Sequence, residues 1–270
     1  MSLPPLAPAP LARTYASLGG EDGWEIVDQY LLVVEWNELN PHEDWRTAAK
    51  TLDIPSSRVE RWYNGQKPHV VKQIETADAL GWFDADWSSD IGRGFNLLVA
   101  AVLSGGYLGA EFELGVTLDD DLDATTEAAL KTAMTTLVGE WKIVNQDDSN
   151  RSTTLRPGKH IALLGRALHV LGAPRGRKTD ALKSIPDYLS AAPQPLRREF
   201  VEIYVLLRGG SSGGGGVDIR EERERAYLTS LSTLIEDVTG ETATTRTNGI
   251  YLRRETVKAL SGEVRWENGD

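Results

Sequence analysis

The chain contains two apolar segments, far apart in the sequence, that both end in a Gly-Gly pair. Residues 95–108 read FNLLVAAVLSGGYL and residues 200–210 read FVEIYVLLRGG. In the first segment the small residues Ala100, Ala101 and Ser104 recur at helical spacing, which lets another backbone approach closely, and a glycine pair ends a helix abruptly. The two segments are therefore predicted to be helices that pack against each other.

The similarity continues after these helices and indicates an internal repeat. In each half a strand, an amphipathic helix, two further strands and a closing helix follow the apolar segment. In the first half the strand is predicted at 111–117, the amphipathic helix at 122–138, and a later strand carries Thr154-Leu155-Arg156. The corresponding segments of the second half are 217–222, 225–239 and Tyr251-Leu252-Arg253. Segments in the same order favour duplication over chance.

A helix that ends in glycine and precedes a strand, present twice in one chain, resembles the LAGLIDADG homing endonucleases. The resemblance covers residues 93–262. It implies an α+β fold in which two signature helices pack on a pseudo-twofold axis and two sheets form a saddle over double-stranded DNA. It also implies a monomer with internal pseudo-symmetry. In that family each signature helix ends with an acid that holds the divalent metal for DNA cleavage.

The chain departs from this family at the position of the acid. With Gly106 and Gly209 as the terminal glycines of the motif, Gly105 and Arg208 stand where the family has acids. A glycine offers no ligand and an arginine repels a metal ion. We therefore expect no catalytic residue, no metal, no cofactor and no endonuclease activity. The alternative is an active endonuclease whose metal ligands lie elsewhere, for instance at Glu111 or Asp218.

Residues 44–68, DWRTAAKTLDIPSSRVERWYNGQKP, are typical of a helix-turn-helix. A first helix is predicted at 47–52 and a second from Ser56 or Ser57, either of which would cap it, with the turn at 53–55. Val59 and Trp62 of the second helix are expected to face inward. The flanking predicted helices are residues 24–39, with core residues Trp24, Ile26, Val27, Tyr30, Leu31, Val34 and Leu39, and residues 69–82.

The second helix of this motif would present polar side chains outward. In the major groove arginine reads guanine and asparagine reads adenine, near the start of a recognition helix, and a lysine just beyond it can hold a phosphate. Helical hairpins with exposed arginines also occur without DNA, which is the alternative interpretation. The residues predicted to contact DNA here are Ser57, Arg58, Arg61, Asn64 and Lys67.

The net charge is −11, so DNA binding requires the basic residues to be concentrated. Residues 151–179 contain no Asp or Glu, and residues 246–258 contain Glu255 as their only acid. Both groups begin on late strands of their repeat, where the resemblance implies phosphate contacts. Alternatively, some of these charges pair with the acidic residues at 119–123. The predicted contacts are Arg156, Lys159, Arg175, Arg177, Lys178, Arg246, Arg253 and Arg254.

The composition indicates the type of organism and the cellular location of the protein. An acidic chain whose 29 basic residues include only nine lysines is typical of a salt-loving organism, so a halophilic archaeon is expected, with an ordinary acidic mesophile as the alternative. The absence of cysteine excludes disulfides and thiolate metal sites. No apolar run approaches the roughly 20 residues of a membrane helix, and the N-terminus does not read as a signal peptide. A cytoplasmic location without membrane contact is expected.

The expected organisation places the helix-turn-helix before the repeats. The segment 208–216, RGGSSGGGG, lacks the lysine and hydroxyl ending of a phosphate-binding loop and is predicted to be a flexible loop. The predicted parts are a disordered tail at 1–20, a helix-turn-helix domain at 21–83, a linker at 84–94, repeats at 95–180 and 181–262, and a C-terminal tail at 263–270.

A helix-turn-helix joined to a LAGLIDADG-like repeat without its acids is similar to the bacterial sporulation regulators that combine the same two parts in the opposite order. The resemblance implies a non-catalytic, sequence-specific DNA-binding protein that acts as a transcription regulator. A second alternative is a protein-interaction module in which the duplicated fold binds a protein partner and no DNA.

Overall fold

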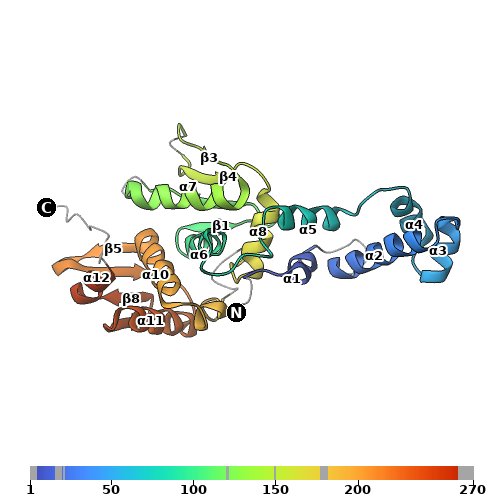
Figure 1. Cartoon of the computed structure of the whole chain (residues 1–270). Helices are drawn as coiled ribbons and strands as arrows, with labels where there is room; N and C mark the ends of the chain where they lie inside the picture. The colour runs from blue at the N-terminus through green and yellow to red at the C-terminus, as the bar shows by residue number, and fades with distance from the viewer. Residues whose placement is uncertain are drawn as a thin grey trace. The chain divides into compact units, whose positions relative to one another are not determined.

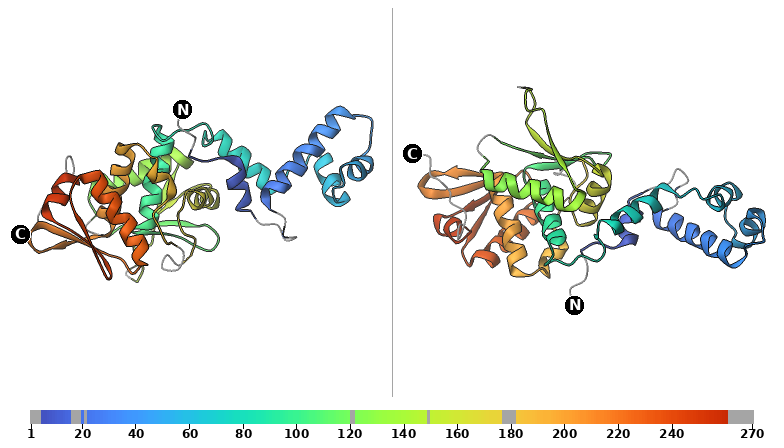
Figure 2. Two further views of the ribbon diagram at one scale, coloured as in Figure 1. Left: turned by 90° about the horizontal axis from the view of Figure 1, so that it is seen from below. Right: turned by 45° about the horizontal axis from the view of Figure 1, so that its top comes forward.

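The computed structural model describes residues 5–15, 20, 22–119, 122–148, 150–176 and 182–260. The chain divides into two compact units, a helical unit at Leu6–Asp84 and a second unit that begins at Ala85. Among the described residues, strands occur only in the second unit (Figures 1 and 2). Arg177, Lys178 and the predicted tail at 263–270 lie outside the described residues.

The helical unit is built around aromatic and aliphatic side chains from all of its helices. Asp22 caps α2 through a capping box with Glu25, and Asp44 caps α3 by accepting a hydrogen bond from the backbone N–H of Thr47. Tyr30 of α2 packs edge-on against Trp62 of α4, with 5.9 Å between ring centroids. The helices are α1 (Pro8–Arg13), α2 (Gly23–Leu39), α3 (Trp45–Leu52), α4 (Ser56–Tyr63) and α5 (His69–Ala79).

The turn between α3 and α4 lies where the sequence predicts it. Asp53 adopts a left-handed conformation with φ 54°, a role that Asp fills more readily than most residues, and ends α3. Val59 and Trp62 are buried, as predicted. The predicted serine cap is wrong, because α4 begins at Ser56 and its N-cap residue is Pro55, which has no side chain to accept a hydrogen bond.

Three further predictions for this unit need correction. The loose tail at 1–20 is wrong for residues 8–13, since α1 packs against α2 and α5 and buries Leu11 and Ala12. Leu31 and Leu39 were predicted in the core but are 53% and 73% exposed, while Val33 is buried in their place. The helix predicted at 69–82 ends at Ala79.

The second unit is α+β and contains two four-stranded antiparallel sheets with the same strand order, β1-β2-β4-β3 and β5-β6-β8-β7. Its first half consists of α6 (Asp90–Leu103), β1 (Gly106–Leu108), β2 (Leu114–Thr117), α7 (Ala124–Val138), β3 (Trp141–Val144), β4 (Thr154–Pro157) and α8 (Ile161–Val170). Its second half consists of η1 (Asp187–Ser190), α10 (Gln194–Arg208), β5 (Gly209–Ser212), η2 (Gly213–Gly215), β6 (Gly216–Arg220), α11 (Arg225–Thr239), β7 (Ala243–Arg246), β8 (Gly249–Leu252) and α12 (Arg254–Leu260).

Each half therefore contains one strand more than the sequence predicts directly after its apolar helix. The glycine pairs lead into β1 and β5, and the segment predicted as a flexible loop at 208–216 forms a hairpin of β5 and β6. The strand predicted at 111–117 begins at Leu114, because Phe112 has φ 62°. The sequence analysis missed β1 and β5 because both begin with glycine, which has a low strand propensity. Pairing with β2 and β6 overrides this low propensity.

The two apolar helices, α6 and α10, are in contact, as predicted. Asn96 of α6 is fully buried and donates a hydrogen bond of 3.0 Å to the backbone carbonyl of Leu196 in α10. Gly105 lies where an added Cβ would be 3.4 Å from Leu207, so the helix ends approach closely. The linker predicted at 84–94 is too long, since Ser89 caps a helix that begins at Asp90.

The observed bounds of the two amphipathic helices agree closely with the predicted bounds. Helix α11 has the predicted bounds, and α7 starts at Ala124 because Asp123 accepts hydrogen bonds from Thr125 and Thr126. Gly139 and Gly240 end α7 and α11 in left-handed conformations. Among the described residues, no helix is long and apolar enough to cross a membrane.

Candidate nucleic-acid interface

Each sheet buries one face and leaves polar side chains on the other. In the first sheet, Leu114, Val116 and Leu155 are fully buried, whereas their neighbours along the strands point the opposite way. We define this opposite side as the open face of the sheet. Helices α6, α7 and α8 pack against strands of this sheet, which accounts for the buried face.

Arg156 lies at the centre of the open face of the first sheet. It is paired across β4 and β3 with exposed Lys142, and its guanidinium donates a hydrogen bond to the hydroxyl of Tyr107. Tyr107 reaches it by lying over Gly115, where any Cβ would come within 2.6 Å of the phenol ring. The open face thus carries two cations and a phenol, a combination suited to phosphate oxygens.

The open face of the second sheet has a different charge pattern. Asp218 of β6 is paired with Tyr251 of β8, and the guanidinium of Arg246 lies 4.4 Å from the Tyr251 ring centroid while it donates a 2.7 Å hydrogen bond to Asp218. Arg220 and Arg246 are the cross-strand partners of Gly249 on its two sides. One carboxylate therefore accompanies two guanidinium groups on this face.

A cavity of about 770 Å³ lies where α6 and α10 end and the second sheet begins. Arg208 at the end of α10 and Ser104 at the end of α6 both line it. The other charged groups of the cavity are Asp218, Arg220, Glu221, Glu222, Arg223 and Arg246. Among the described residues, four guanidinium groups and three carboxylates therefore lie at the ends of the two central helices.

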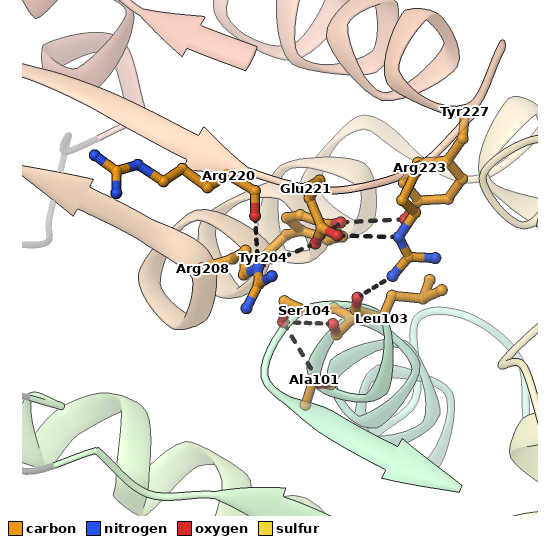
Figure 3. Close-up of polar contacts among 10 residues, drawn as sticks. Ala101, Leu103, Ser104, Tyr204, Arg208, Arg220, Glu221, Arg223 and Tyr227 are labelled. Carbon is orange, nitrogen blue, oxygen red and sulfur yellow. Dashed lines mark hydrogen bonds and ion pairs between the residues drawn. The ribbon is translucent and has the colours of Figure 1, made fainter. Parts of the chain in front are cut away.

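Glu221 connects Tyr204, Arg208 and Arg223 beside this cavity (Figure 3). Its carboxylate is buried and accepts hydrogen bonds from the Tyr204 hydroxyl at 2.8 Å and from Nε of Arg223 at 3.0 Å. Nε of Arg208 lies 3.4 Å from the same carboxylate and donates to the backbone carbonyl of Arg220 at 2.9 Å. A buried charge requires such partners, and here a single carboxylate is shared by two guanidinium groups.

Arg223 joins the two halves of the unit. Its Nη2 donates a 2.7 Å hydrogen bond to the backbone carbonyl of Leu103, so an arginine of the second half satisfies a carbonyl at the end of α6. Its guanidinium also lies 4.4 Å from the ring centroid of Tyr227. Burial raises the pKa of Tyr204 well above its usual value, and burial raises the pKa of Tyr227 to about 12 although Arg223 opposes that shift.

The outward side of α4 carries the predicted DNA-reading residues. Ser57, Arg61 and Asn64 are exposed, and Nε of Arg61 donates to the backbone carbonyl of Ser57. Arg58 is only partly exposed because its guanidinium donates a hydrogen bond to Gln29 of α2. Lys67 follows the helix in the chain and pairs with Glu75 at 2.5 Å; the hydrogen bond to Glu75 is the main cause of its raised pKa.

The remaining predicted phosphate contacts are dispersed. Lys159 pairs with Glu140 at 3.3 Å, and the guanidinium of Arg175 lies 4.7 Å from the Phe112 ring centroid. Arg253 and Arg254 are exposed but follow β8 in the chain. The pairing of β2 with β4 and of β6 with β8 makes Tyr251 the counterpart of Arg156, so the sequence alignment of Arg253 with Arg156 is wrong by two residues.

The two carboxylates considered as alternative metal ligands lie in different surroundings. Asp218 is engaged by Arg246, and Glu111 is exposed in the loop between β1 and β2. In the described parts of the chain, no group of three or more His, Cys, Asp or Glu side chains is arranged to hold a metal ion.

Among the functional candidates that escaped sequence reasoning are Tyr107, on the open face of the first sheet, and Arg220, Glu221 and Arg223, in the cavity. Tyr107 could have been found from strand alternation if β1 had been recognised, and Arg220 from its alternation with Asp218 along the predicted strand at 217–222. Glu221 and Arg223 could not, since their burial depends on the Leu103 carbonyl 120 residues away in the sequence. Compared with models of known protein families and with curated proteins, the sequence matches none.

Proposed function

We propose that this chain is a non-catalytic, sequence-specific DNA-binding protein, with helix α4 reading bases and a LAGLIDADG-like duplicated unit contacting the phosphate backbone. One observation carries the proposal. Both halves of the second unit have the order helix, two strands, helix, two strands, helix, the same strand order, and central helices in contact. That arrangement agrees with the resemblance drawn from Gly106 and Gly209.

The charge distribution supports a duplex as the partner. The chain is acidic overall, yet Arg156, Lys142, Arg220 and Arg246 lie on the open faces of the two sheets. Phosphate contacts of this kind set position and affinity, whereas base contacts carry sequence information. A regulator of transcription needs both, and exposed Arg61 at the end of α4, with exposed Asn64 directly after it, is available for the base contacts.

The absence of catalysis is part of the proposal and rests on Arg208. At the end of α10 a guanidinium, engaged with Glu221, occupies the position that corresponds to a metal-holding acid in the family it resembles. An arginine there would repel a divalent ion rather than bind it.

The test is a selection from a random duplex library with the full chain, followed by binding of the selected and scrambled duplexes at several salt concentrations. We expect the selected sequence to bind at least about a thousandfold more tightly than the scrambled one, as in specific protein–DNA complexes. Incubation of supercoiled DNA with magnesium or manganese should produce no cleavage. Failure to enrich any sequence would contradict sequence-specific binding, and cleavage would contradict the non-catalytic assignment.

A further inference from the structure

We propose that the cavity at the ends of α6 and α10 is a phosphate-binding site in which Arg208, Arg220 and Arg246 are the donors. The source of the phosphate, a DNA backbone, rests on the function proposed above. The ability of the site to bind phosphate does not rest on that function. It follows from which hydrogen-bond donors in the cavity already have a partner and which are free.

Arg208 is held in place through its Nε, and its two Nη atoms are free to donate hydrogen bonds to a ligand. Its Nε is used by the Arg220 carbonyl and by Glu221, and within the described part of the chain no hydrogen bond uses either of its Nη atoms. The side chain is 45% exposed, so these Nη atoms are accessible from the cavity. A guanidinium with two free N–H₂ groups forms the fork that matches two oxygens of one phosphate.

Arg220 and Arg246 approach the same space from the sheet. They flank Gly249, so about 10 Å separates their Cα atoms, a span that two arginine side chains can close around one phosphate. Gly249 adopts φ 151° and a Cβ there would come 2.0 Å from the Ile219 carbonyl, which keeps the position between them free of a side chain. Arg220 forms no ion pair with any residue in the described part of the chain.

The carboxylates of the cavity do not cancel the positive charge of its arginines. Glu221 is buried and occupied by Tyr204, Arg208 and Arg223. Asp218 is bonded to Arg246, which retains further N–H donors. Glu222 is exposed and its side chain is able to turn to solvent.

The helix ends would by themselves disfavour an anion, because the carboxyl end of a helix carries partial negative charge. Arg223 donates to the Leu103 carbonyl at the end of α6, and Arg208 occupies the end of α10. These two arginines make the net charge at the helix ends positive. Buried Glu221 then serves to hold the two guanidinium groups in position, leaving the outer one to meet the ligand.

The experiment compares the full chain with Arg208→Gln and Arg220→Gln, each of which removes one guanidinium. The matched control is Lys131→Gln, which removes one positive charge from α7, a helix that does not line the cavity. A mixed-sequence duplex is titrated at a series of salt concentrations, and inorganic phosphate and ATP are titrated by calorimetry. Thermal melts check folding, and Arg220→Gln keeps the test valid if Arg208→Gln unfolds, since Arg220 is exposed.

We expect each cavity variant to weaken duplex binding about tenfold and to lower the slope of log K against log salt by about 0.9, with Lys131→Gln close to the parent. Should duplex binding be unchanged while the parent binds phosphate or ATP and Arg208→Gln does not, the site is supported with a free phosphorylated ligand as its source. A parent that binds duplex, variants that match Lys131→Gln and no heat from phosphate or ATP would overturn the site and leave the proposed function intact. A parent that fails to bind duplex would refute the proposed function, and the phosphate and ATP titrations alone would then decide the site.

Discussion

Glu221 shows how one buried carboxylate sets the chemistry of its surroundings. A buried charge without partners is very unfavourable, yet Glu221 has three, and two of them are cations. The arrangement fixes Arg223 against the end of α6 and aims Arg208 outward. Because the carboxylate belongs to the second half and the helix to the first, a single residue contributes to the stability of the whole second unit.

Replacing Glu221 with Gln should destabilise the second unit by about 3 to 5 kcal/mol, since buried Arg223 would lose its only carboxylate partner among the described residues. Chemical denaturation at neutral pH measures the change. The matched control is the neighbouring exposed residue: Glu222→Gln should stay within about 0.5 kcal/mol of the parent. Equal effects of the two substitutions would contradict a structural role for the buried carboxylate.

The buried tyrosines make stability sensitive to alkaline pH. The unfolded phenol of Tyr227 loses its proton near its usual pKa of 10, whereas the folded one keeps it until about 12. Below about pH 10 both states are protonated and this stability is fully present. Between about pH 10 and 12 the unfolded state holds fewer protons, so the free energy of unfolding falls as the pH rises, by about 2 to 3 kcal/mol from this group.

Tyr227→Phe should remove that part of the alkaline loss, because no proton is left to release. Denaturant unfolding of parent and variant, from neutral pH to about 12, provides the comparison. The parent curve should fall more steeply than the variant curve above pH 10. Parallel curves would mean that the phenol of Tyr227 titrates alike in the folded and unfolded states.

At the scale of elements, each apolar helix joins its first strand at one glycine that leaves no room for a side chain, whereas the next residue of the second junction, Gly210, has room. A Cβ at Gly106 would lie 2.8 Å from the Gly115 carbonyl, and one at Gly209 would lie 2.6 Å from the Val205 carbonyl. A Cβ at Gly210 would have nothing closer than 3.9 Å. Matching constraints at Gly106 and Gly209 agree with their equivalent places in the two sheets.

Gly106→Ala and Gly209→Ala should each destabilise the second unit by about 1 to 3 kcal/mol, because a methyl group would force the backbones apart. Gly210→Ala is the control, and it should be neutral or slightly stabilising since it restricts the unfolded chain. Melting temperatures of the three variants are sufficient to compare them. A neutral Gly106→Ala would show that the junction has more room than its geometry indicates.

These elements also show what sequence patterns can and cannot predict. Helices α6, α10 and α11 were predicted because apolar periodicity and terminal glycines are local signals. Helix α1 was missed because its sequence is rich in proline, and β5 because its residues are glycine and serine; both depend on packing against distant segments. The cavity was beyond prediction for the same reason, since Arg223 and Leu103 meet only after folding.

For the whole molecule, the proposal assigns two kinds of DNA contact to two separate units. The helical unit offers exposed Arg61 in the last turn of α4 and exposed Asn64 directly after it, and the second unit offers Arg156 on an open sheet face. A base edge carries sequence identity, whereas a phosphate carries only charge. The two surfaces should therefore fail in different ways when they are altered.

Arg61→Ala and Asn64→Ala should reduce discrimination by about 1 to 3 kcal/mol at one or two base positions and leave the remaining positions unchanged. Arg156→Ala should weaken binding to all duplexes about equally and lower the salt slope by about one phosphate contact. Each variant is titrated with the selected duplex, single-base changes of it and a scrambled duplex, at several salt concentrations. If α4 variants lost affinity equally for every duplex, α4 would be a phosphate contact and base reading would have to lie elsewhere. If all three variants bound every duplex as the parent does, neither surface would contact DNA, and a protein partner would become the better explanation of the duplicated unit.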